Sequence, residues 1–224
     1  MHRHIDIYCE RVGTAFWAEP LNAVSNLAFI IAGLLLVQVL RREDPAVRRD
    51  PAVIALVALV FAIGIGSGLF HTFAVVWAAL TDVIPIALFI LLYMYVALRR
   101  MIALPFWTCI LSLLGVLALV SAMPILFGFS LPTYGVALTA MVVVGGFLHF
   151  VRSNPAGMPI LLTAGIFAVS LTLRTIDLPL CDVLPIGTHY FWHILNAVVL
   201  YRLARIAMRH GRVGSAVVPA GQTP

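Results

Sequence analysis

Long apolar runs, separated by short polar stretches, make up most of this chain. A bilayer core of about 30 Å needs roughly 17–25 apolar residues per helix, and seven segments reach or approach that length. They are expected at residues 21–40, 52–72, 76–98, 102–123, 133–151, 158–174 and 187–208. The breaks between them are rich in proline, glycine and aspartate, which favour turns. The pattern predicts an all-α integral membrane protein, a bundle of seven transmembrane helices.

The same pattern divides the chain into three parts. Residues 1–20 form a polar N-terminal segment, residues 21–208 the seven-helix membrane domain and residues 209–224 a tail. The first part lacks the short apolar core of a cleaved signal peptide. Composition agrees with a membrane protein, because 62% of the residues are hydrophobic, only 10% are charged and the mean hydropathy is +1.08. A soluble domain has about 25% charged residues.

The arginines predict the orientation of the bundle. The chain has no lysine, and only Arg3, Arg11 and Arg174 of its 14 arginines are expected at the membrane face that holds the N-terminus. The positive-inside rule places the other face, with the remaining arginines, in the cytoplasm. The N-terminus is then outside and the C-terminal tail is cytoplasmic. Because most arginines flank apolar segments, the net charge of +5 is a topology signal and does not indicate nucleic-acid binding.

Several polar residues interrupt the apolar segments at one membrane depth. Helices of alternating direction place His71, Asp82, His189 and His193 near the non-cytoplasmic face. His189 and His193 are four residues apart and share one helix face, and Ser67 lies one turn from His71 in the same way. An ionisable residue within a spanning helix costs about 2.5–3.5 kcal/mol on insertion scales, which favours a functional purpose.

Three imidazoles suit a tetrahedral zinc ion with an open fourth position for water. Zinc lowers the pKa of such a water to about 7, and Asp82 could orient a histidine or take the water proton. Other interpretations remain open: the histidines could hydrogen-bond between helices, Ser67 could pack or bond its own helix, and Asp82 could pair with Arg174. No role is expected for the other histidines, which are His2, His4, His149 and His210.

Three carboxylates lie near the start of the first helix: Asp6, Glu10 and Glu19. Carboxylates together with carbonyl oxygens suit calcium. Taken alone, however, these residues favour a solvated helix cap, in which Glu19-Pro20 opens the helix with an acid at its N-terminus. The polar residues that follow are expected to hydrogen-bond between helices and not to bind metal; they are Asn22, Ser25 and Asn26.

The three cysteines fall in two environments. Cys9 and Cys181 are both expected on the non-cytoplasmic side, where an oxidising compartment permits a disulfide, so they could pair. Cys109 lies inside a predicted helix and is expected to be inert packing.

Together these motifs resemble a known family, the alkaline ceramidases, and more broadly the seven-helix CREST membrane hydrolases. The resemblance rests on Ser67-x3-His71, on Asp82 eleven residues after that histidine, and on His189-x3-His193. The stretch AEPLNAVSN, residues 18–26, is similar to the opening of the first ceramidase helix. The resemblance covers nearly the whole chain.

This resemblance implies an intramembrane zinc amidase that splits ceramide-like N-acyl lipids into a fatty acid and a sphingoid base. His71, His189 and His193 would hold zinc, Ser67 would support the water or the developing oxyanion, and Asp82 would handle protons. The active site would lie toward the non-cytoplasmic side.

The resemblance also implies a calcium site, built in the family from an acid-aromatic-Cys-Glu-x-Asn pattern and a later glutamate. Glu10 and Glu19 match this pattern, whereas Asp6 lies one residue further from Cys9 than expected and Val12 replaces the asparagine. Calcium is therefore a second possible cofactor. The resemblance also favours a disulfide between Cys9 and Cys181.

A rival hypothesis keeps the metal but not the reaction: a zinc-stabilised seven-helix receptor or lipid-binding protein. Ser67 and Asp82 beside the predicted ligands favour the enzyme, because a structural zinc site closes its fourth position. A transporter is less favoured, since the chain shows no repeated pair of broken helices.

Overall fold

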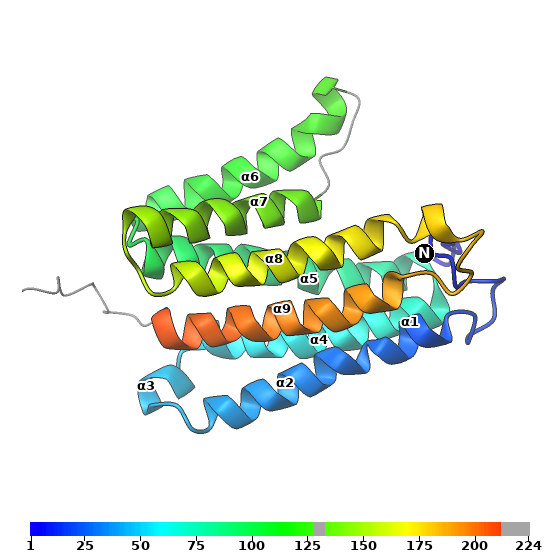
Figure 1. Cartoon of the computed structure of the whole chain (residues 1–224), viewed down its shortest axis with the longest axis horizontal. Helices are drawn as coiled ribbons and strands as arrows, with labels where there is room; N and C mark the ends of the chain where they lie inside the picture. Colours follow the sequence, from blue (N-terminus) through cyan, green and yellow to red (C-terminus); the bar gives the residue numbers. More distant parts are fainter. Residues whose placement is uncertain (128–132, 212–224) are drawn as a thin grey trace, which may run out of the picture.

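The computed structural model describes residues 1–127 and 133–211, and its long helices lie roughly side by side (Figure 1). The described residues form no β-strand. The helices are α1 (Pro20–Ser25), α2 (Leu27–Leu40), α3 (Pro45–Arg48), α4 (Pro51–Phe73), α5 (Val76–Val96), α6 (Phe106–Phe127), α7 (Thr133–Gly146), α8 (Gly157–Thr175) and α9 (His189–His210). Short π-helical turns, Ala97–Met101 and Phe147–Val151, extend α5 and α7. The all-α prediction is confirmed.

Several of these helices are long and apolar enough to cross a membrane. In the described part of the chain, five segments qualify: Pro20–Leu40, Pro51–Phe73, Val76–Met101, Thr133–Val151 and Gly157–Thr175. They indicate a multi-pass membrane protein. The described apolar stretch of α6 is shorter, and α9 carries arginines in its second half. Seven spans, and the side of the membrane on which each end lies, therefore stay predictions.

Helix boundaries follow local chemistry at both ends of α4. Pro51 opens the helix, and the Asp50 side chain accepts a hydrogen bond from the Ala52 backbone N–H at 2.9 Å, as expected of an N-cap. The helix ends at Phe73 and is capped by Ala74, which has a left-handed φ of 46°. The tight turn that follows brings α5 back along α4.

The helices α4 and α5 approach closely because of a glycine. A Cβ atom added at Gly66 would overlap the backbone carbonyl of Thr81 on α5. Around this pair, α2, α8 and α9 bury an apolar core that includes Leu36, Leu56 and Phe89. Of the predicted tail 209–224, residues 212–224 lie outside the described part.

Segments far apart in the sequence meet at one end of the bundle, here called the N-terminal end (Figure 1). This end comprises residues 1–19, the α4–α5 turn and the α8–α9 loop. The Ile5 backbone N–H donates to the Ala74 carbonyl at 2.8 Å. A disulfide bond joins Cys9 to Cys181 of the α8–α9 loop, the pair that the sequence suggested. The opposite end, here called the arginine end, holds the α2–α4 and α7–α8 connections and the end of α9.

Candidate active site

Three histidines gather in the bundle core at the N-terminal end. His71 lies on the last turns of α4, and His189 and His193 lie on the first two turns of α9. Ligand nitrogens, one from each ring, lie within 4.8 Å of one another. All three side chains are at most 2% exposed. The structure thus brings together the histidines that the sequence assigns to zinc.

Hydrogen bonds fix the tautomers of two of these rings. Nδ1 of His71 lies 2.5 Å from Oε2 of Glu19, and a carboxylate only accepts, so Nδ1 carries the proton. The hydroxyl of Ser25 donates to the Asn22 carbonyl at 2.9 Å, so its oxygen accepts from Nδ1 of His193 at 2.7 Å. In a neutral ring of this tautomer, Nε2 carries no proton and can bind zinc.

The third ring is held by stacking. The rings of His189 and Tyr8 lie 3.7 Å apart between centroids, with 19° between their planes. The Tyr8 hydroxyl accepts a hydrogen bond from Nη1 of Arg174 at 2.9 Å. Among the described residues, Nδ1 of His189 and Nε2 of His71 are buried and have no hydrogen-bond partner. Buried ring nitrogens without partners are unusual, and a metal ion would satisfy them.

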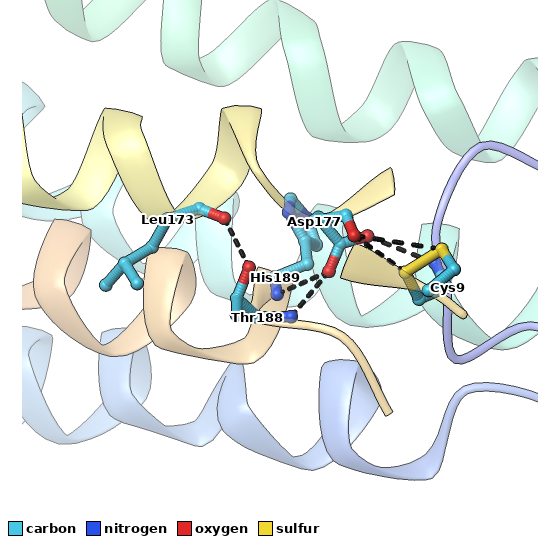
Figure 2. The surroundings of a disulfide bond; sticks show 6 residues. Cys9, Leu173, Asp177, Thr188 and His189 are labelled. Carbon is cyan, nitrogen blue, oxygen red and sulfur yellow. Dashed lines mark hydrogen bonds between the residues drawn. A yellow bond between two sulfur atoms is a disulfide. The ribbon is translucent and has the colours of Figure 1, made fainter. Parts of the chain in front are cut away.

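Asp177 holds the backbone where α9 begins (Figure 2). Its Oδ1 accepts from the backbone N–H groups of Thr188 at 2.6 Å and His189 at 2.9 Å, and its Oδ2 accepts from that of Cys9 at 3.0 Å. A carboxylate at a helix N-terminus is stabilising. Gly187 has a φ of 63°, and a Cβ atom there would overlap Asp177. The sequence interpretation missed this residue.

Ser67 and Asp82 lie beside the histidines. Ser67 is one turn before His71, and its side chain interacts with the carboxyl of Asp82 on α5. Asp82 lies close enough to His71 and Arg174 for electrostatic interaction. Its Oδ1 is buried and has no hydrogen-bond partner in the described part of the chain. Among the described residues, Asp82 and Arg174 form no direct ion pair, so they interact at longer range.

An apolar cavity extends from these polar groups into the bundle. Ser67, Asp82 and His193 line one part of it, and its walls continue along α5 and α9 as far as Ala97 and Leu203. Asp82 and Ala97 are about 22 Å apart along a helix that rises 1.5 Å per residue. A long apolar chain with a polar group at one end fits such a cavity.

Comparison with models of protein families shows the family of this chain. The family model described as Ceramidase matches residues 5–213, most of the chain. The chain belongs to the alkaline ceramidase family. The resemblance that the sequence motifs suggested is confirmed, and membership supports an enzyme that hydrolyses the amide bond of ceramide. A comparison with curated proteins gives no match.

The calcium expectation drawn from the ceramidase pattern finds no support at Glu19. Its Oε1 forms an ion pair with Nε of Arg11, and its Oε2 accepts from His71 and from Nδ2 of Asn22 at 3.0 Å. Burial raises the pKa of Glu19, but the hydrogen bonds from His71, Asn22 and Arg11 hold that pKa below its ordinary value. Both oxygens are thus already engaged by protein donors.

The other two carboxylates do not complete a calcium site either. Oε1 of Glu10 accepts from the Leu21 N–H at 2.6 Å and Oε2 accepts from the Asn22 N–H at 2.8 Å. Glu10, and not Glu19, therefore caps the first helix. Among the described residues, Asp6, Glu10 and Glu19 form no group that could hold a metal ion. The residues present do not fit calcium.

Proposed function

We propose that this member of the ceramidase family is an intramembrane zinc amidase. It hydrolyses a ceramide-like N-acyl lipid to a fatty acid and an amine. The observation that carries the proposal is the buried group of His71, His189 and His193, with ring nitrogens free to bind a metal, beside Ser67 and Asp82. Three neutral imidazoles with a fourth position left open form a donor set that zinc takes in catalytic sites.

The histidines would hold the ion, and nearby side chains would carry the proton and stabilise charge. A zinc ion bound there would polarise the amide carbonyl and lower the pKa of a water to about 7. Asp82 takes a proton from the attacking water and returns it to the leaving nitrogen, as a general base and then a general acid. The Ser67 hydroxyl donates a hydrogen bond to the carbonyl oxygen as that oxygen gains negative charge.

The cavity sets the orientation of the lipid. The acyl chain lies along the apolar walls formed by α5 and α9, and the amide lies at the polar part lined by Asp82 and His193. Burial of the chain contributes binding free energy in proportion to its apolar area.

The side of the membrane is part of the same proposal. We infer from the arginine distribution that the N-terminal end, with the histidines, lies on the non-cytoplasmic side. The disulfide between Cys9 and Cys181 supports this, because disulfides persist in oxidising compartments.

The test compares Asp82→Asn with the wild type and with Asp182→Asn, a matched change at an exposed position. Zinc content and fatty-acid release from mixed N-acyl lipids are measured on the same purified preparations. Asp82→Asn should keep its zinc and lose about 10²–10⁴ in rate, the contribution of general acid–base catalysis. Asp182→Asn should match the wild type.

Two outcomes would contradict the proposal. Normal release by Asp82→Asn would remove Asp82 from the chemistry. A zinc-loaded wild type that binds N-acyl lipids and releases no fatty acid would favour the receptor or lipid-binding alternative.

A further inference from the structure

Arg11 is a buried cation beside the histidine group. Its side chain forms an ion pair with Glu19, donates from Nη2 to the His71 carbonyl at 3.0 Å and from Nη1 to the Gly13 carbonyl at 3.4 Å. The residue is 6% exposed. One guanidinium therefore connects the N-terminal loop, the start of α1 and the end of α4.

Arg11 interacts with His71 in two ways, through Glu19 and by a direct hydrogen bond. Through Glu19 it acts on the side chain, because the same carboxylate accepts from Nδ1 of His71. Directly, it holds the backbone carbonyl of His71. A carboxylate bonded to a metal-ligating histidine fixes the ring and raises its basicity. The pair of Arg11 and Glu19 thus positions both the ring and the backbone of one proposed ligand.

The hydrogen-bond partners of Arg11 are oxygen atoms of the types that coordinate calcium. Calcium takes carboxylate and backbone carbonyl oxygens, and here the Glu19 carboxylate and the carbonyls of Gly13 and His71 all turn to the guanidinium. Val12 has no side-chain oxygen to offer at the position where the family pattern has asparagine. A guanidinium presents five donors in a fixed fork and stays charged, so it can satisfy several such oxygens at once.

We propose that the guanidinium of Arg11 takes the place of the calcium ion expected from the family pattern, so that this protein needs no calcium. It neutralises Glu19, fastens residues 8–13 to the end of α4 and positions His71 for the metal. The zinc site itself rests on the proposed function, whereas the claim about calcium does not. Removing one partner of a buried ion pair leaves an uncompensated charge, which is why the role of Arg11 can be tested by substitution.

The first experiment uses the full-length wild-type protein and calcium alone as the probe. Calcium is removed with a selective chelator and then added back to millimolar concentration, while bound calcium, zinc content and the thermal unfolding midpoint are measured. We expect no stoichiometric calcium and no change in either other quantity. Calcium bound at one per chain, or an unfolding midpoint that rises with calcium, would overturn the proposal.

The second experiment replaces the cation. Arg11→Met keeps the length of the side chain without its charge, and we expect zinc affinity to fall roughly 10–100-fold, as for other partners of metal ligands. Arg11→Lys keeps the charge and should retain more of the affinity. Arg3→Met, at an exposed N-terminal arginine, is the matched control and should bind zinc as the wild type does.

Wild-type zinc affinity in Arg11→Met, or equal losses in the Met and Lys variants, would overturn the role of Arg11 as a cation. If Arg11→Met does not fold, Arg11→Lys and the calcium measurement on the wild type still decide the question. A wild type that binds no zinc would defeat the proposed function, and the calcium result would remain a separate answer.

Discussion

Several charged side chains are buried at one end of the bundle, whereas charged side chains at the other end are mostly exposed. At the N-terminal end, Arg11, Glu19 and Asp177 are each at most 6% exposed, and each bonds a histidine or the start of the helix that carries two of them. At the arginine end, Arg41 and Arg42 are exposed. An ion pair at this end joins Asp50 to Arg100, whose side chains are 10% and 12% exposed.

The two ends therefore use charge for different purposes. Buried charges at the N-terminal end position the histidine group, and exposed arginines at the arginine end are expected to set the orientation of the protein in the membrane. Burying a charge is costly unless it is paired and hydrogen-bonded, and the N-terminal end meets this requirement with contacts that converge on the histidines. Exposed arginines need no partner and suffice for topology. Substitutions of the buried charges at the N-terminal end should therefore affect stability and metal binding together, and substitutions at the arginine end should affect stability alone.

The largest of the three stability effects is expected at Asp177. Asp177→Ala leaves the N–H groups of Cys9, Thr188 and His189 without their acceptor, and hydrogen bonds to a charged group contribute about 1.5–3 kcal/mol each. The free energy of unfolding should fall by about 4–5 kcal/mol, the low end of the sum over these three bonds, and zinc binding should weaken. Chemical denaturation and zinc titration measure the two effects. Asp182→Ala is the control, and unchanged stability in Asp177→Ala would break the comparison.

A smaller effect is expected where α4 meets α5. Gly66→Ala should lower the free energy of unfolding by about 1–3 kcal/mol, the usual range for overpacking, because its Cβ would meet the Thr81 carbonyl. Gly146→Ala on α7 has open space around its Cβ and serves as the control. Both variants are compared by thermal unfolding. Equal stability of the two would show that the helices are not in close contact at Gly66.

The smallest effect concerns pH at the arginine end. Burial raises the pKa of Asp50, but hydrogen bonds from Arg100 and from the Ala52 N–H outweigh it and lower that pKa below 3.8. The ion pair therefore stabilises the fold above about that pH, and this stability is lost as pH falls through the lower folded value. Asp50→Asn should cost at most about 1 kcal/mol at neutral pH.

Asp50→Asn should also lose part of the acid dependence of stability while zinc content stays unchanged. Unfolding midpoints between pH 3 and pH 7 measure the first effect. A loss of zinc in this variant would contradict the separation between the two ends.

The helices and the histidine group were predictable from the sequence, because apolar length fixes a span and alternating direction fixes depth. His71 and His193 meet for this reason although they lie far apart in the chain. The contacts of residues 1–19 were not predictable in this way, since the segment has no helical period to give its register. Asp177 was missed because the groups that it binds lie in a loop whose path depends on the whole fold.

The calcium expectation shows the same limit. Glu10 and Glu19 match a family pattern, but what a carboxylate binds depends on its neighbours in space. Arg11 pairs with Glu19, and the first helix presents its free N–H groups to Glu10. The solvated cap that the sequence favoured at Glu19 is wrong, because Glu19 is buried and its side chain makes no capping hydrogen bond. Glu10 caps the first helix instead.

The most direct test of the central claim is the zinc content of three purified proteins, each first confirmed as folded by size-exclusion chromatography. The wild type should hold about one zinc per chain, as a single three-histidine site requires. His193→Ala should hold almost none, and His149→Ala, altered toward the arginine end, should match the wild type. Full zinc content in His193→Ala, or equal losses in both variants, would contradict the claim that the buried histidine group binds the metal.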